Sequence, residues 1–132
     1  MKVKDFMTKG IVTCYSNDSI DEIAEIMDAN NIGFVAVCDD DEEIIGVITD
    51  RDIVIGPVMD NEKSIEDFYS NNIISIEENS DVDEALSLMK ENKVERLLVT
   101  KKGKYTGVLS IFDLLEENDT KDIITTLKEI KG

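Results

Sequence analysis

Two short segments of the chain carry the residues whose types and spacing could bind a ligand. They are residues 46–53, GVITDRDI, and residues 107–114, GVLSIFDL. Each places a hydroxyl, Thr49 or Ser110, at the end of an apolar run and a carboxylate, Asp52 or Asp113, three residues later. If a helix begins there, its free N–H groups and dipole form an anion site, to which the hydroxyl can add a hydrogen bond to phosphate. The carboxylate can accept both hydroxyls of a ribose. The alternative is simple N-capping, for which the same residue types are preferred.

Arginine is scarce in this chain. It holds only two, Arg51 and Arg96, and Arg51 lies inside the first segment. Arginine is the better bidentate partner for phosphate, and in a chain of net charge −16 an anionic ligand needs such a local positive charge. The alternative for Arg51 is a surface ion pair with Asp50 or a neighbouring Glu, which contributes little.

The composition excludes several classes of function. Among 132 residues there are 30 Asp and Glu, 14 Lys and Arg, and no His. The acidic balance disfavours binding to nucleic acid and to anionic membranes, since both require a basic face. Without His, serine–histidine catalysis and His-ligated metal sites are excluded. With 42% hydrophobic and 33% charged residues, the composition is that of a globular chain.

The cysteines, the residues after Met1 and the lengths of the apolar runs together indicate the cellular compartment. Cys14 and Cys38 have no metal-binding spacing and are too few for a disulfide framework, so we expect both to be buried free thiols. Met1 is followed by mixed charged sequence rather than a basic and then apolar leader. No apolar run approaches the length of a membrane span. We therefore expect a soluble, cytoplasmic protein.

The chain contains two copies of one unit. An offset of 62 residues gives nine identities in 33 aligned positions, among them Met27 with Met89, where about two are expected by chance. One residue is then lost, and an offset of 61 aligns Gly46 with Gly107. Such self-similarity is the signature of a duplicated structural unit.

Each copy is predicted to form a strand, a helix, two strands and a second helix. Helix starts are indicated by the capping box Ser19-x-x-Glu22 and, in the second copy, by Asp81-x-x-Glu84. In the first copy the strands are expected at residues 11–14, 34–38 and 44–49. The second helices are expected at residues 50–55 and 111–116.

Two further features lie outside this pattern. Pro57, the only proline, is expected to mark the stop of the second helix. Residues 119–131 carry Ile123, Ile124, Leu127 and Ile130 at helical spacing, which predicts a third amphipathic helix. The predicted organisation is repeat 1 at 3–57, a linker at 58–64, repeat 2 at 65–117 and a C-terminal helix at 118–132.

A unit of about 60 residues with three short strands rarely stands alone. We therefore expect an α/β (α+β) fold in which the two copies pack through their sheets. A pseudo-twofold pair of this kind leaves two related clefts, which are natural places for a small ligand.

The doubled unit, its Gly-hydrophobic-x-[Ser/Thr]-x-x-Asp-hydrophobic endings and the ITDRDI stretch at residues 48–53 resemble a CBS-domain pair, or Bateman module. The resemblance covers residues 3 to about 117, and the chain is similar to stand-alone CBS-domain pairs. It implies two β-α-β-β-α units packed through their sheets, a disc-like homodimer, and clefts for AMP, ADP, ATP or S-adenosylmethionine.

The resemblance also implies roles for individual residues. Asp52 and Asp113 match the positions that hold the ribose diol, and Thr49 and Ser110 match hydroxyls near the ribose and phosphate. Arg96 matches a basic residue that commonly reaches the phosphate.

Other positions distinguish the two copies or depart from the family. Phe34 is the first copy's counterpart of Arg96, so the two clefts are not equivalent. Tyr15 falls where the family often meets the adenine. The proline usual in the family's second strand is replaced by Ala36 and Leu98.

The sequence therefore favours a non-enzymatic ligand sensor that needs no cofactor and no metal and that signals to an effector protein by conformational change. A ligand-free dimerisation scaffold is the alternative. An enzyme is disfavoured because the chain lacks His, a Walker-type glycine loop and a metal-binding carboxylate constellation. The acidic loop 39–43 and the basic loop 101–104 are expected to be solvated turns, although in an antiparallel dimer they could approach each other.

Overall fold

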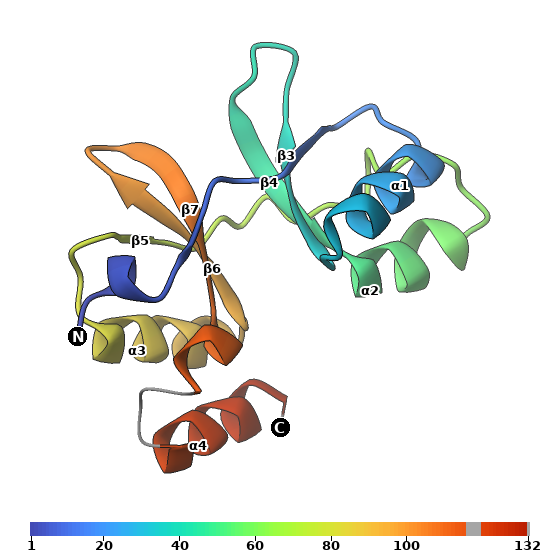
Figure 1. Cartoon of the computed structure of the whole chain (residues 1–132). Coiled ribbons are helices and arrows are strands. Elements are labelled where there is room, and N and C mark those ends of the chain that lie inside the picture. Colours follow the sequence, from blue (N-terminus) through green and yellow to red (C-terminus); the bar gives the residue numbers. More distant parts are fainter. Residues whose placement is uncertain (116–119, 132) are drawn as a thin grey trace. The chain divides into compact units, whose positions relative to one another are not determined.

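The chain forms two compact units, and one of them is built from both ends of the sequence (Figure 1). The computed structural model describes residues 1–115 and 120–131. One compact unit, here the first unit, is Val12–Ile73; the second unit combines Met1–Ile11 with Ile74–Gly132. The first residues of repeat 1, up to Ile11, thus belong to the unit built from the second repeat.

The first unit is a three-stranded sheet with helices. Its elements are β2 (Thr13–Tyr15), α1 (Ile20–Asn30), β3 (Phe34–Cys38), β4 (Ile44–Thr49), α2 (Asp50–Ile53) and a π-helical turn, Val54–Val58. The strand order is β2-β3-β4, with β3 parallel to β2 and antiparallel to β4. Val35, Val37 and Ile48 of the sheet pack with Ile23 and Met27 of α1. The helical spacing of the α1 residues is what places them together on the sheet.

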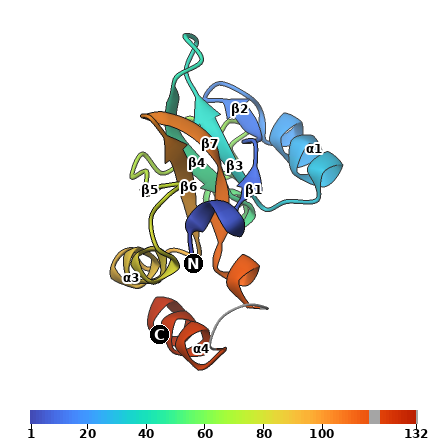
Figure 2. The same cartoon turned by 60° about the vertical axis from the view of Figure 1, so that its left-hand side comes forward.

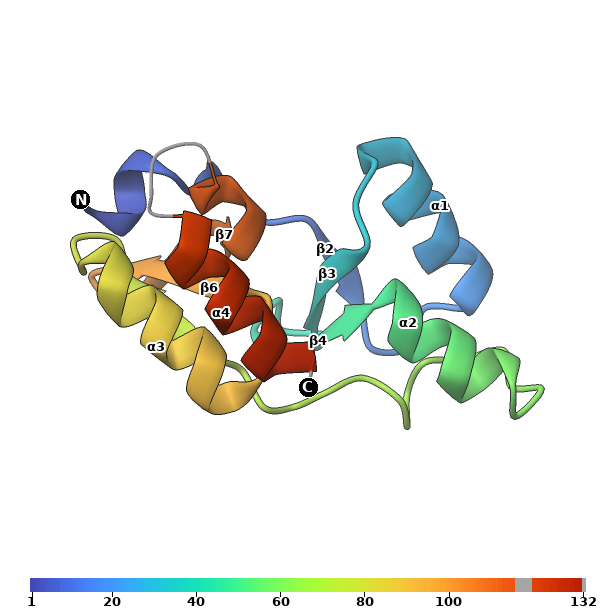
Figure 3. The ribbon, with the colours of Figure 1, turned by 90° about the horizontal axis from the view of Figure 1, so that it is seen from below.

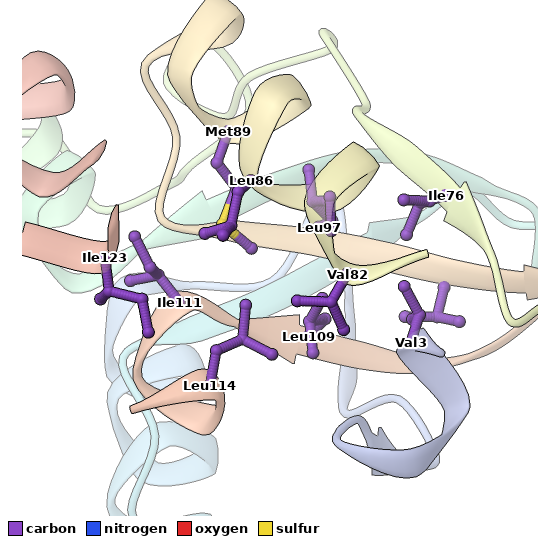
Figure 4. Packing of buried hydrophobic residues seen from close by; sticks show 12 residues of the cluster. Val3, Ile76, Val82, Leu86, Met89, Leu97, Leu109, Ile111, Leu114 and Ile123 are labelled. Carbon is purple, nitrogen blue, oxygen red and sulfur yellow. The ribbon is translucent and has the colours of Figure 1, made fainter. Parts of the chain in front are cut away.

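The second unit repeats this plan with additions at both ends. Its elements are a 3₁₀ turn (Val3–Asp5), β1 (Thr8–Lys9), β5 (Ser75–Glu77), α3 (Val82–Asn92), β6 (Arg96–Lys101), β7 (Lys104–Ser110), a 3₁₀ turn (Ile111–Leu114) and α4 (Thr120–Lys131). The strand order is β1-β7-β6-β5. Figure 4 shows its core, in which residues of α3, β6 and β7 meet Val3 from the amino-terminal turn and Ile123 from α4.

The predicted helix starts are confirmed. The Ser19 hydroxyl accepts a hydrogen bond from the Glu22 N–H (3.2 Å), and the Asp81 carboxylate accepts one from the Asp83 N–H (2.9 Å). These side chains satisfy donors that the first helical turn leaves free. The mixed α+β class, the strands Phe34–Cys38 and Ile44–Thr49, and the burial of both cysteines are also as predicted.

The prediction for Pro57 was wrong, because the helix continues through it to Val58. An α-helical turn would bring the proline ring against the carbonyl four residues earlier. The chain instead widens into a π-helical turn over Val54–Val58, which changes that spacing. In the second repeat the helix expected at residues 111–116 is a 3₁₀ turn over Ile111–Leu114, the counterpart of α2, and Glu116 lies outside the described residues.

The predicted C-terminal helix is present as α4, beside α3 (Figure 3); Asp119 lies outside the described residues. Ile123 is fully buried, and Leu127 and Ile130 pack against the same core. Ile124 was wrongly placed on this face: it is 46% exposed, because one residue turns the helix by about 100°. None of the helices in the described ranges is long and apolar enough to cross a membrane.

In each unit a segment distant in sequence packs its backbone against the hairpin, a contact that sequence analysis missed. We call this segment the arm; it is β1 in the second unit and the backbone at Ser70 in the first. In the second unit β1 pairs antiparallel with β7, so that Thr8 lies opposite Val108 and Lys9 opposite Gly107 (Figure 2). A Cβ atom at Gly107 would lie 2.3 Å from the Thr8 carbonyl oxygen. In the first unit, a Cβ at Gly46 would lie 2.4 Å from the Ser70 carbonyl oxygen. The repeated glycines therefore leave room for the backbone of the arm.

We expect Gly107→Ala to lower the melting temperature, because the added methyl group must push β1 away from β7. Overpacking of this kind costs about 1–3 kcal/mol, and each kcal/mol corresponds to roughly 3–5 °C at this chain size. Differential scanning calorimetry measures the shift. Lys104→Ala, an exposed change on the same strand, is the control and should stay near the wild-type value. A Gly107→Ala protein as stable as the control would contradict the arm contact.

Two neighbouring isoleucines of α4 provide a second test. Ile123→Ala removes a fully buried side chain and is expected to reduce the free energy of unfolding by about 2–5 kcal/mol. Ile124→Ala, at an exposed position, is expected to change it by less than about 0.5 kcal/mol. Urea unfolding of both variants measures the difference. Equal losses would mean that α4 does not pack as described.

Candidate functional site

Three of the predicted site residues come together in the second unit, where β6 begins and β7 ends. Arg96 lies directly opposite Ser110 in the antiparallel register of β6 and β7. The Ser110 hydroxyl accepts a hydrogen bond from the Phe112 N–H (3.2 Å), and the Asp113 carboxylate accepts one from the Ser110 N–H (2.9 Å). The hairpin and the capping box together hold a guanidinium, a hydroxyl and a carboxylate at one end of the sheet.

A third and a fourth charged side chain, Glu95 and Lys131, adjoin this group. The Glu95 carboxylate, with a side chain only 19% exposed, lies 3.8 Å from Arg96 Nη1 through Oε2 and 2.8 Å from Lys131 Nζ through Oε1. One carboxylate thus joins two cations, one from β6 and one from the last turn of α4. Sequence analysis missed both Glu95 and Lys131. Glu95 could have been suspected as the neighbour of Arg96, but no sequence signal connects it with Lys131.

The first unit builds the same cap with different charges. The Asp52 carboxylate accepts from the Thr49 N–H (3.0 Å), and the Thr49 hydroxyl accepts from the Asp52 N–H (3.1 Å). Phe34 takes the place of Arg96 opposite Thr49. A Cβ at Gly33, the counterpart of Glu95, would lie 2.7 Å from Asp50 Oδ2. The start of β3 therefore has a carboxylate beside it and no cation on the strand.

Neither Arg51 nor Tyr15 takes part in the hairpin contact between Phe34 and Thr49. The Arg51 side chain is exposed, and its guanidinium makes no ion pair with any residue that the structure describes. Tyr15 pairs with Cys38, at the opposite end of β3 from Phe34. Its hydroxyl donates to Glu42 (3.2 Å), and this hydrogen bond raises the pKa of the Tyr15 hydroxyl. The structure thus groups Tyr15 with the acidic hairpin loop.

The thiols and the acidic loop offer little chemistry. Burial raises the pKa of the Cys14 thiol to about 12 and also raises that of Cys38, so both are neutral at pH 7. Asp39 accepts hydrogen bonds from the N–H groups of Asp41 and Glu43 (both 3.0 Å), which closes the loop as a turn. Among the described residues no cluster of three or more Cys, Asp or Glu side chains could hold a metal ion.

The absence of the family's usual proline has a structural consequence. The Ala36 N–H donates to the Val12 carbonyl, and the Leu98 N–H donates to the Ile74 carbonyl, both at 3.0 Å. Proline has no N–H and could make neither bond. The parallel pairing of β2 with β3 and of β5 with β6 therefore gains one hydrogen bond at each of these positions.

A surface groove of about 350 Å³ lies elsewhere in the first unit. It is bounded by the first turn of α1 and by residues 57–63, with Asp21, Glu62 and Lys63 as its charged residues. None of the predicted site residues lines it, so it is separate from the Thr49 cap.

Comparison with known proteins assigns the repeats to a family. The family model described as CBS domain matches residues 3–56 and again residues 65–119. The uncharacterized protein YlbB of Bacillus subtilis is 35% identical over 125 residues, which are 92% of this chain and 84% of that protein.

Solved structures show the same fold. The CBS domain protein TA0289 of Thermoplasma acidophilum, described as of unknown function, matches with a TM-score of 0.87 at 22% identity, covering 99% of this chain and 76% of that one. The CBS domain pair of protein MJ0100, solved in complex with 5′-methylthioadenosine and S-adenosyl-L-methionine, matches with a TM-score of 0.78 at 29% identity and covers 86% and 92%.

The capping role of Asp113 can be measured without any ligand. Asp113→Ala removes the acceptor of the Ser110 N–H, which should lower stability by about 1 kcal/mol, as for other helix caps. Asp113→Asn keeps an acceptor oxygen and should recover most of this loss. Thermal unfolding of the ligand-free variants measures both. An unchanged melting temperature for Asp113→Ala would show that the cap contributes nothing and that the carboxylate is free for other partners.

Proposed function

The chain belongs to the CBS domain family, of which it carries two copies, and on this basis we propose that it is a non-catalytic regulatory module that binds an adenosine-containing ligand. The proposed ligand residues of the second unit are Arg96, Ser110 and Asp113. Those of the first unit are Thr49, Arg51 and Asp52.

The observation that carries this proposal is the register of β6 and β7. By placing Arg96 opposite Ser110, with Asp113 bonded to the same residue, the hairpin presents a phosphate donor and a ribose acceptor side by side. The cap occupies one oxygen of Asp113. Among the described residues the other oxygen accepts no hydrogen bond, and it can therefore accept a ribose hydroxyl.

Adenosine ligands are supported by a structural neighbour. The CBS domain pair of MJ0100 was solved with 5′-methylthioadenosine and S-adenosyl-L-methionine. For this chain the candidates are these two compounds together with AMP, ADP and ATP. The adenine contact of Tyr15 stays a prediction. It would require the base to lie near Glu42, the partner of the Tyr15 hydroxyl.

Signalling would follow from a ligand that binds one conformation better than another, which shifts the population read by an effector protein. We propose a homodimer as the signalling form. An exposed apolar patch in the first unit, formed by Val54, Ile55, Val58 and Met59, supports association. The same patch also supports the second candidate function, a dimerisation scaffold that binds no ligand.

The binding proposal predicts that Asp113→Ala weakens binding far more than Asp40→Ala, an equal charge change in the exposed acidic loop. Hydrogen bonds to a charged group are worth about 1.5–3 kcal/mol each, so we expect at least a tenfold loss of affinity. Isothermal titration calorimetry with 5′-methylthioadenosine, S-adenosylmethionine, AMP, ADP and ATP measures it. Equal affinities of the two variants would refute the ribose assignment.

Two controls separate the rival functions. If no compound in the panel binds, while sedimentation shows a dimer that Val58→Asp and Met59→Asp dissociate, the scaffold is favoured. If chromatography shows that ATP is consumed during incubation, the module is catalytic, because a sensor returns its ligand unchanged.

A further inference from the structure

We infer that Glu95 and Lys131 set the charge of the ligand that the second unit accepts, so that it favours adenosine compounds with little or no phosphate charge over adenosine triphosphate. This inference rests on the proposed function and makes it more specific. It assigns a specificity role to a carboxylate and to the last turn of α4, and sequence analysis had placed neither of them in the site.

The Glu95 carboxylate is shared by two cations, Arg96 and Lys131. Glu95 is the residue before Arg96 and lies beside its guanidinium, with 3.8 Å between Oε2 and Nη1. Because the Glu95 side chain is only 19% exposed, solvent screens this pair less than it would a surface pair. A phosphate group that approaches Arg96 must also approach Glu95, and the two anions repel each other.

Lys131 contributes a positive charge beside Glu95. Its ammonium lies 2.8 Å from Oε1 of Glu95 and so offsets part of the negative charge beside Arg96. Lys131 itself is 65% exposed. The helix that carries it is nevertheless fixed in place by the buried Ile123 (Figure 4). The last turn of α4 is therefore held where it can compensate Glu95.

The formal charges of the four side chains in this cluster sum to zero. Arg96 and Lys131 supply two positive charges, and Glu95 and Asp113 supply two negative ones, in a chain of net charge −16. Such a cluster can orient a polar group through the donors of Arg96, but it has no net positive charge to offset a triphosphate. A thioether or a sulfonium at the ribose 5′ position meets no such penalty.

The first unit is still less suited to phosphate. The position of Arg96 is held by Phe34, and the carboxylate of Asp50 lies where a side chain at Gly33 would be. The cationic residue close in sequence to the Thr49 cap is Arg51, whose side chain is exposed. The charges of both units therefore favour the same kind of ligand, so binding in the first unit would not reverse the preference.

The test compares affinities for 5′-methylthioadenosine, AMP and ATP in the full chain by isothermal titration calorimetry. Wild-type protein should bind 5′-methylthioadenosine most tightly and ATP least. Glu95→Gln keeps the shape of the side chain and removes its charge. At distances of several ångströms this should tighten ATP binding about tenfold and AMP binding less, with 5′-methylthioadenosine unchanged. Lys131→Met should weaken AMP binding about threefold and also leave 5′-methylthioadenosine unchanged.

Matched variants control for net charge. Glu91→Gln on α3 and Lys128→Met on α4 change exposed residues by the same charge and should leave all three affinities as in wild type. The ratio of the ATP and 5′-methylthioadenosine affinities is the decisive readout, since a loss of folding would weaken both ligands together.

The outcomes separate this inference from the proposed function. Wild-type protein that binds ATP as tightly as 5′-methylthioadenosine, or a Glu95→Gln variant with an unchanged ratio, overturns the charge selection and leaves the binding module standing. Wild-type protein that binds none of the three compounds, and neither S-adenosylmethionine nor ADP, overturns both.

Discussion

The close approach of an arm backbone to a glycine in each hairpin is the contact on which the arrangement of this chain depends. At Gly107 the approaching atom is the carbonyl oxygen of Thr8, and at Gly46 it is that of Ser70. Only a residue without Cβ admits a backbone so near. The hairpin edge is covered in this way, and an uncovered edge would present unpaired backbone groups. The glycine that begins each sequence motif thus has a packing role, whereas the hydroxyl and the carboxylate after it form the cap.

The two caps are alike, but the surroundings of each have diverged. Thr49 and Asp52 bond to each other's backbone in the first unit, and Ser110 and Asp113 form the same capping box in the second. Around the second cap lie Arg96, Glu95 and α4. The face of α3 under α4 has changed as well, because the buried Leu86 corresponds to the exposed Ala24 of α1. An added helix in one repeat has therefore been matched by a larger apolar residue beneath it.

Local signals in the sequence were sufficient where a short-range hydrogen bond or a helical period decides the structure. Ser19 and Asp81 cap the helices expected of them, and the doubled hairpin follows from its apolar runs. Interactions between distant segments were not predictable. Nothing near Glu95 in the sequence indicates Lys131, and the two-residue strand β1 is too short to show alternation. The helix end predicted at Pro57 was wrong because a π-helical turn tolerates the proline. Ile124 misled because four isoleucine and leucine positions suggested one face where only three share it.

The interleaving of the two units has a consequence for the order in which they can form during synthesis. The first unit is complete once residue 73 has left the ribosome, so it can fold while the rest of the chain is still being made. Strand β1, although translated before the first unit, must wait for β7, whose residues emerge about a hundred positions later. The backbone of residues 1–4, which bonds to residues 78–82, must wait until that later segment has emerged. Residues 1–11 are thus made before the first unit but can be ordered only after that unit is complete.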